Sequence, residues 1–221
     1  SALSGKPHVA KEDIKQFLST LKYPLYHFDF ETFDTAVPLF DKSRPYQKIP
    51  FQYSLHIEQE DGSIKHREYL ADSSQDPRPE LLKQMKDDLE GTGDIVVFNK
   101  SFEISVMKKL AGDFPEHEEW LLKAIERIVD LADVFRLYYY YDASQKGSYS
   151  IKRVLPAITG KSYSELEINN GGDASMMYFY SHIQHKLENK EEIRQNLLKY
   201  CCLDTEGMVW IVDRLEEFAN V

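Results

Sequence analysis

The spacing of hydrophobic and polar positions predicts three strands in the first third of the chain. The aromatic-rich run 23–30 (YPLYHFDF) is typical of a strand, and similar runs follow at 51–58 and 64–71. Asp61 and Gly62 lie between the second and third runs, and an Asp-Gly pair favours a tight hairpin turn. We therefore expect these three strands to form an antiparallel meander.

After this meander, helical and strand patterns alternate. Apolar side chains at helical spacing predict helices over 79–90, 102–110 and 116–125. The short apolar run 94–99 is typical of a buried parallel strand, and 127–131 predicts a fifth strand. The remaining segments are expected to be helical: 131–141, 149–158, 173–187 and 189–219, the last broken near 202–205.

This order predicts an α/β fold, in which three antiparallel strands and then parallel strands form a mixed sheet flanked by helices. We expect residues 1–22 to be a helical extension and residues 23–221 to be a single domain. The chain begins Ser1-Ala2 without a methionine, which we interpret as the mark of a domain excised from a longer protein.

Composition restricts the possible partners and the compartment. The net charge of −10 argues against a protein that coats nucleic acid, although a small cation-binding site can still contact phosphate. No apolar run approaches the roughly 18 residues of a membrane span. Cys201 and Cys202 are adjacent and form a poor disulfide pair, so a reducing cytoplasm is the expected location.

Acidic residues at three separate places are the candidate chemistry. Asp29 and Glu31 alternate with aromatic residues on the first strand and therefore share one face, where two like charges favour a divalent cation. Glu103 opens a predicted helix, and Asp204 follows Tyr200 by four residues. Each has an ordinary alternative when taken alone: solvated acids at a strand end, an acid in a first helical turn, or a helix cap.

Taken together, the three places form an ordered pattern: Asp29-x-Glu31-Thr32, then Asn99-x-x-Phe102-Glu103, then Tyr200-x-x-x-Asp204. This pattern resembles the DEDD 3′–5′ exonuclease superfamily, whose fold is RNase H-like. The Tyr-x-x-x-Asp spacing resembles its tyrosine branch, since the histidine branch would have His where Lys199 stands. Glu103 departs from the family pattern, which usually has Asp there.

Three longer segments, 49–56, 147–152 and 200–205, resemble one bacterial domain family within that superfamily. It is predicted to be an exonuclease and is often found behind a RecB/Cas4-like nuclease domain. The resemblance therefore implies a DNA or RNA 3′ end as substrate and such a nuclease domain in the same full-length chain.

The resemblance implies hydrolysis of phosphodiester bonds with two divalent cations, Mg²⁺ or Mn²⁺. Asp29, Glu31, Glu103 and Asp204 would hold the ions, and Tyr200 would orient the attacking water. The substrate contacts it implies are Thr32, Phe30, Asn99, Phe102 and Lys152, although core packing is the ordinary alternative for the two phenylalanines.

A second hypothesis is a catalytically weakened module of the same fold that binds nucleic acid or a partner nuclease domain. Its support is Glu103 and the acidic net charge. His27 and His56 have no His or Cys partner at a metal-ligand spacing, so the sequence predicts no zinc site.

Overall fold

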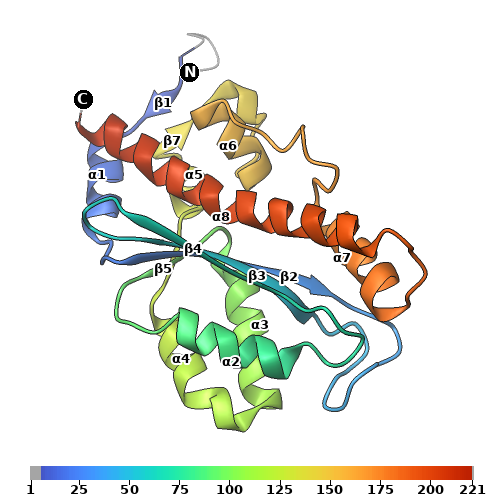
Figure 1. Cartoon of the computed structure of the whole chain (residues 1–221). Helices are drawn as coiled ribbons and strands as arrows, with labels where there is room; N and C mark the ends of the chain where they lie inside the picture. Colours follow the sequence, from blue (N-terminus) through green and yellow to red (C-terminus); the bar gives the residue numbers. More distant parts are fainter. Residues whose placement is uncertain (1–5, 221) are drawn as a thin grey trace.

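A five-stranded mixed sheet forms the centre of the protein (Figure 1). The computed structural model describes residues 6–220. The sheet order is β4-β3-β2-β5-β6, with β3 antiparallel to β2 and β4, and β5 parallel to β2 and β6. The strands are β2 (Leu25–Phe33), β3 (Ile49–Glu58), β4 (Ile64–Leu70), β5 (Ile95–Val97) and β6 (Ile128–Asp130). The expected α/β fold, a mixed sheet of antiparallel and parallel strands flanked by helices, is thereby confirmed.

Helices cover both faces of this sheet, with α1, α6, α7 and α8 on one side and α2, α3 and α4 on the other (Figure 1). Each face packs on its own hydrophobic cluster. The helices are α1 (Lys11–Ser19), α2 (Arg78–Asp88), α3 (Lys100–Asp113), α4 (Glu118–Glu126), α5 (Asp133–Arg136), α6 (Ile151–Thr159), α7 (Gly171–Tyr178) and α8 (Lys190–Asn220). Short 3₁₀ turns occur at Pro115–His117 and Ala143–Gln145, and a π-helical turn at Phe179–Ile183 follows α7.

Strand β2 separates its apolar and acidic side chains onto opposite faces of the sheet. Phe28 and Phe30 belong to the core on the α2–α3 side and meet edge to face, with ring centroids 4.6 Å apart. Asp29 and Glu31 point the other way, toward α8, because strand side chains alternate. The expectation that these two acids share a face holds in the structure.

A β-bulge lies between β2 and β3, next to the two acids. The register shifts so that Glu31 pairs with Gln52 while Thr32 pairs with Pro50, which leaves Phe51 without a partner. Phe51 then stacks on Tyr178 at 3.9 Å between ring centroids. A bulge bends its strand and redirects side chains. Here it allows two consecutive residues, Phe51 and Gln52, both to make contacts on the α8 side of the sheet.

The expected helix over 131–141 is wrong for most of its length. Only the four residues of α5 are helical, and Tyr138 has a left-handed φ of 59° that ends the turn. The chain then forms the two-residue strand β7 (Tyr140–Tyr141), which pairs with β1 (His8–Val9). This pairing joins residues more than 130 positions apart, so local periodicity could not reveal it.

Two further helix expectations need correction. Helix α8 runs unbroken from Lys190 to Asn220, without the expected break at 202–205, so Asp204 lies within a helix and does not cap one. Helix α7 begins at Gly171, with the Asn170 side chain accepting a hydrogen bond from the Asp173 N–H. Asn170 therefore provides the N-cap expected of Asp173.

The N-terminal extension is held against the domain by contacts of α1 with α8 and by the β1–β7 pair. Ser1 and Ala2, which suggested an excised domain, lie outside the described residues. Across residues 6–220, no helix combines the length and apolar character needed to cross a bilayer.

Candidate active site

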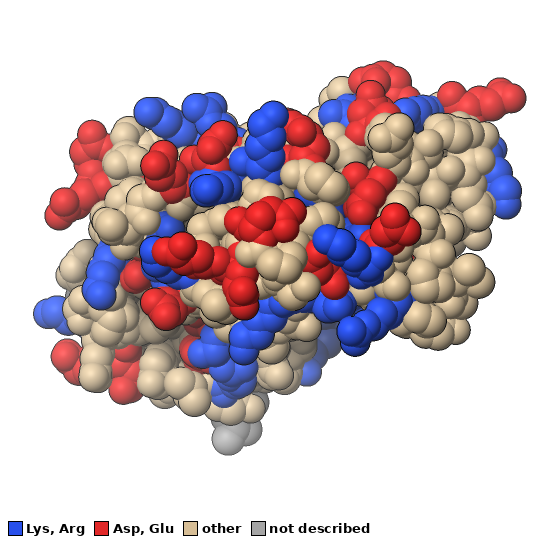
Figure 2. All heavy atoms as spheres, turned by 90° about the horizontal axis from the view of Figure 1, so that it is seen from below, with Lys and Arg blue, Asp and Glu red and all other residues tan. Residues whose placement is uncertain are grey.

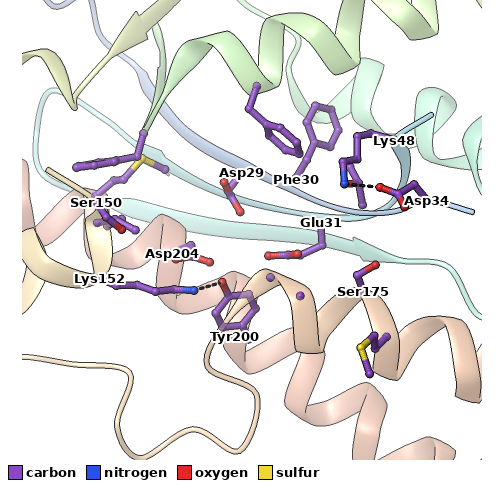
Figure 3. A pocket seen from close by; sticks show the side chains of 18 residues that line it. Asp29, Phe30, Glu31, Asp34, Lys48, Ser150, Lys152, Ser175, Tyr200 and Asp204 are labelled. Carbon is purple, nitrogen blue, oxygen red and sulfur yellow. Dashed lines mark hydrogen bonds and ion pairs between the residues drawn. The ribbon is translucent and has the colours of Figure 1, made fainter. Parts of the chain in front are cut away.

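The candidate active site is an open cavity of about 610 Å³ on the α8 side of β2. Its wall combines β2 with the starts of α3, α6 and α7 and the middle of α8. Figure 3 shows Asp29, Glu31, Asp204, Lys152 and Tyr200 converging on the centre of this cavity. Side chains separated by up to 175 positions therefore face one space.

Three carboxylates form the centre of the site. Asp29, Glu31 and Asp204 each offer an oxygen atom, and these atoms all lie within 4.8 Å of one another. Asp29 is half-buried, whereas Glu31 and Asp204 are buried. The strand brings the first two to the α8 face, and the helix that crosses this face brings the third.

Buried polar contacts hold α8 at the position that this arrangement needs. The Thr205 hydroxyl lies 2.8 Å from Ser54 Oγ and 2.8 Å from His56 Nδ1, both on β3. Further along β3, Gln52 Nε2 donates to the carbonyl oxygen of Leu197. Since Thr205 directly follows Asp204, these bonds fix the position along α8 at which Tyr200 and Asp204 face β2.

Burial raises the pKa of all three carboxyl groups, and repulsion by neighbouring acids adds to the rise for Asp29 and Glu31. For Asp29, burial is the largest cause, followed by the charges of Asp204, Glu31 and Glu103, and the pKa lies well above its usual value. Glu31 is raised well above its usual value by burial and by Asp204. Burial raises the pKa of Asp204 to about 6, although hydrogen bonding from Tyr163 opposes the rise. The site therefore favours bound protons or bound cations at neutral pH.

Glu103 lies beside the three-carboxylate group but outside it. Its side chain is buried on α3, and its charge is close enough to raise the pKa of Asp29. Burial, with a further contribution from Asp130, raises the pKa of Glu103 to about 8. Its Oε2 atom has no hydrogen-bond partner among residues 6–220. A buried carboxylate oxygen without a donor is a position that a cation or an ordered water can satisfy.

Two tyrosines and a lysine surround Asp204. Tyr163 Oη donates to Asp204 Oδ1 at 2.6 Å. Lys152 Nζ donates to the Tyr200 hydroxyl at 2.9 Å, as Figure 3 shows. The ammonium group also lies 5.0 Å from the Tyr200 ring centroid. Burial and the nearby acids raise the pKa of Tyr200, so its phenol stays neutral and can orient a group by hydrogen bonding.

The other expected site residues divide into two groups. Thr32, Phe30, Phe102 and Lys152 line the cavity with the carboxylates, although Phe30 is largely buried in the core. Asn99 does not line this cavity; it precedes α3 with a left-handed φ of 90° and lines a neighbouring hollow.

Asp130 explains the position of Asn99. The Asp130 carboxylate accepts hydrogen bonds from the backbone N–H groups of Asn99, Lys100 and Ala132. It thereby fixes the start of α3, the helix that carries Phe102 and Glu103. Asn99 is thus part of the support for the site and contacts its Ser101 neighbour through Oδ1.

Sequence reasoning missed Tyr163 as a contributor to the site, whereas Lys48 belongs to a basic loop in which a phosphate contact is expected from the sequence. Tyr163 lies in a loop of ordinary polar composition, and no spacing relates it to Asp204. Lys48 lines the cavity from the loop after β2 and forms an ion pair of 2.5 Å with Asp34 (Figure 3). The positive charge of that loop is visible in the sequence, whereas the side chain that reaches the cavity is decided by the path of the loop.

The donor set fits a hard divalent cation. Carboxylate oxygens are the ligands that Mg²⁺ and Mn²⁺ prefer, and opposite oxygens around an octahedral Mg²⁺ lie about 4.2 Å apart. The observed limit of 4.8 Å requires only a small contraction of Asp29, Glu31 and Asp204 around an ion. The unpartnered Oε2 of Glu103 could serve a second ion or its water shell.

Comparison with known proteins identifies the family. A family model described as "Domain of unknown function (DUF2779)" matches residues 26–150, which include nearly all of β2 and the whole of β3 and α3. The chain belongs to the DUF2779 family. The match covers Asp29, Glu31 and Glu103 and ends before Tyr163, Tyr200 and Asp204.

Mycoplasma and Ureaplasma proteins are similar to this DUF2779 domain. "Uncharacterized protein MG366 homolog" of Mycoplasma pneumoniae is 28% identical over 92% of this chain and 34% of its own length. "Uncharacterized protein UU173" of Ureaplasma parvum is 30% identical over 68% of this chain and 25% of its own length. The chain thus spans about a third or less of these relatives. No solved structure matches it significantly.

Proposed function

We propose that this DUF2779 domain is a metal-dependent 3′–5′ exonuclease that hydrolyses single-stranded or frayed nucleic acid, in the manner of the tyrosine branch of the DEDD superfamily. The observation that carries the proposal is the convergence of Asp29, Glu31 and Asp204 within 4.8 Å inside an open cavity. Tyr200 and Lys152 line the same space. The first and third parts of the ordered sequence pattern thus contribute to one spatial cluster, and Glu103 of the second part lies beside it.

The protein residues have separable roles in this proposal. Asp29, Glu31 and Asp204 would hold the principal cation, and Glu103 a second ion or its water shell. Bound divalent cations supply Lewis acidity and lower the pKa of a water molecule. Tyr163 holds the carboxylate of Asp204 in one orientation.

Tyr200 and Lys152 face the position where the scissile phosphate would lie. The neutral Tyr200 phenol can orient a water molecule, and Lys152, which now donates to that phenol, can turn its charge toward a phosphate oxygen. Both residues come from helices, so their placement is well defined.

A basic groove next to the cavity supports a single strand as the substrate. Arg44, Tyr46, Lys48, Lys108 and Lys109 line this groove, and Lys48 also lines the catalytic cavity. The acidic net charge does not prevent this, since Lys and Arg gather in local clusters on the face seen in Figure 2. Tyr46 is 70% exposed, and an exposed ring beside basic residues can stack on a base.

The proposal is tested by digesting oligonucleotides with the purified protein. A 5′-labelled single strand should shorten stepwise from its 3′ end with Mg²⁺ or Mn²⁺, and EDTA should stop the reaction. A 3′-phosphorothioate strand should resist digestion, and a circular single strand should stay intact. Cutting of the circle would indicate an endonuclease, and a complete lack of metal-dependent cleavage would refute the proposal.

Tyr200→Phe separates orientation of the water from metal binding. Loss of the hydroxyl should slow trimming roughly 10- to 100-fold while leaving the Mn²⁺ affinity within about twofold, because the phenol is not a proposed ligand. Single-turnover trimming and Mn²⁺ titration measure the two quantities. Tyr149→Phe, at an exposed tyrosine, is the control. Loss of Mn²⁺ binding in Tyr200→Phe would instead show a structural role.

Charge reversal tests the groove. The double variant Arg44→Glu with Lys108→Glu should raise KM for a 20-nucleotide strand about tenfold. The slope of log affinity against log salt concentration should also become shallower, by the amount expected for the loss of about two phosphate contacts. Cleavage of a dinucleotide should remain unchanged, since it does not reach the groove. Lys15→Glu with Lys65→Glu is the matched control of equal charge, on exposed positions of α1 and β4. Equal effects of both pairs would place the strand elsewhere.

A binding module without hydrolysis is the second candidate. The observation that favours it is Glu103, which lies outside the three-carboxylate group. Under this alternative, fluorescence anisotropy would detect a labelled single strand bound with divalent cations present, while the strand remains uncut.

We also propose that the domain acts within a longer protein that carries a RecB/Cas4-like nuclease domain. The support is that the relatives are about three or more times longer than the matched region. Assaying a full-length relative with each nuclease site inactivated in turn would test whether two activities reside in one chain.

A further inference from the structure

A second cluster of metal-ligating side chains lies on the far side of α8 from Tyr200. His56 on β3, His66 on β4 and Cys202 on α8 each offer one ligand atom, and these atoms all lie within 4.8 Å of one another. The two histidines are direct cross-strand partners. We infer that His56, His66 and Cys202 form a zinc site that fastens α8 to the β3–β4 hairpin.

Hydrogen bonds already orient both imidazole rings as they would in a metal site. His56 Nδ1 lies 2.8 Å from the Thr205 hydroxyl, and His66 Nε2 lies 3.0 Å from the Ser54 hydroxyl. Metal-bound histidines typically use one ring nitrogen for the ion and give the other to such a partner. These contacts leave Nε2 of His56 and Nδ1 of His66 for an ion.

The hydrogen bonds of this network are consistent with two neutral histidines, each with one ring nitrogen unprotonated and able to bind a metal ion. The Thr205 hydroxyl donates to the carbonyl oxygen of Cys202 at 3.1 Å and can therefore accept from His56 Nδ1–H. Ser54 can then donate to Thr205 and accept from His66 Nε2–H. Every hydroxyl hydrogen has an acceptor in this arrangement, and the remaining nitrogen of each ring keeps a free lone pair.

The donor types select zinc over the cations of the carboxylate site. Imidazole nitrogen and thiolate sulfur suit Zn²⁺, whereas an oxygen-only set suits Mg²⁺ or Mn²⁺. A fourth ligand can come from water, since the Glu68 carboxylate lies 3.9 Å from His66 Nε2, the ring nitrogen that faces Ser54. The side chains of His66 and Glu68 are 31% and 37% exposed, which gives an ion a path to the site.

Zinc binding requires a modest rearrangement. Neighbouring ligand atoms in a tetrahedral zinc site lie roughly 3.3–3.7 Å apart, so the cluster must contract by about 1 Å. The two rings are stacked, with centroids 4.4 Å apart and planes inclined by 23°, and both planes must turn toward one ion. His66 lies on the edge strand β4 and is partly exposed, so its ring can make this turn.

Zinc and cobalt titration tests the site. Protein stripped with a chelator should bind one Zn²⁺ per chain, measured by elemental analysis after gel filtration and by competition with a chromogenic chelator. Co²⁺ in its place should give a thiolate charge-transfer band in the near ultraviolet. His66→Ala and Cys202→Ser should each weaken zinc binding at least tenfold, and Cys202→Ser should abolish the band. His185→Ala, at an exposed histidine, should change neither.

Asp29→Asn separates this site from the carboxylate site and should retain both zinc and the cobalt band. Zinc that is lost in Asp29→Asn but kept in Cys202→Ser would overturn the proposal, because the ion would then belong to the carboxylates. Failure of the stripped protein to bind zinc in one-to-one ratio would overturn it as well.

Discussion

Asp29→Asn is expected to reduce metal-dependent 3′ trimming at least about a thousandfold, equivalent to roughly 4 kcal/mol in the activation free energy. Asp29 is the central member of the carboxylate group, and its pKa responds to Asp204, Glu31 and Glu103 alike. The amide has nearly the same shape but no negative charge, so it removes a cation ligand without leaving a void. Single-turnover trimming of a 5′-labelled strand measures the loss.

The same variant should be folded and, without metal, more stable than the wild type. Asparagine removes the cost of ionising a half-buried carboxyl group whose acidic neighbours repel its charge. Asp61→Asn, at the exposed hairpin turn, is the matched control and should trim at the wild-type rate. Trimming by Asp29→Asn at near wild-type rate would show that the carboxylate cluster is not the catalytic centre.

The metal-free protein is expected to lose about 2 kcal/mol of stability between pH 6.5 and 8.5 because of Glu103. Burial raises the pKa of this carboxyl group to about 8, whereas in the unfolded chain it ionises near pH 4.5. Between these values the folded state holds a proton that the unfolded state has released. Stability therefore falls as pH rises, by about 1.4 kcal/mol per pH unit for each such proton.

Between pH 6.5 and 8.5, the change in stability comes from the carboxyl groups and not from the buried histidines. Burial lowers the pKa of His56 and His182 to about 4, so these residues add stability as pH rises, but only up to about 6.5. Above that pH, the falling contribution of Glu103 acts without them, and Asp29 and Glu31 contribute in the same direction.

Melting temperature against pH, with EDTA or with Mg²⁺, measures this effect. The difference between wild type and Glu103→Gln should change by roughly 4–8 °C across the window, because the variant has no proton to lose there. Mg²⁺ should stabilise the wild type more at pH 8.5 than at 6.5, since ionised carboxylates bind it. Parallel pH curves for wild type and Glu103→Gln would mean that Glu103 is not held protonated.

The strands were predictable from the sequence where local pattern and packing agree. Phe28 and Phe30 alternate with Asp29 and Glu31, and the sheet buries the aromatic pair on one face. The helices were less predictable where a distant partner intervened, since β7 forms only because β1 pairs with it. For α8 the sequence predicted a break that does not occur, because packing against β3 keeps the helix continuous through 202–205.

The site shows the same division. The order of Asp29, Glu31, Glu103, Tyr200 and Asp204 was enough to suggest a single cluster of acids. The relative positions of these residues could not be predicted from the sequence, because they are set by hydrogen bonds between distant parts of the chain, such as those of Thr205 with Ser54 and His56.

The sequence alone therefore determined the mixed sheet and the residue types that carry the chemistry, because alternation along a strand and periodicity along a helix are local properties. The tertiary structure decided that Glu103 stands apart from the other three acids, that Tyr163 holds Asp204, and that His66 and Cys202 meet His56. These outcomes depend on how α8 packs across the sheet, and that packing joins residues too far apart in sequence for any local pattern to relate them.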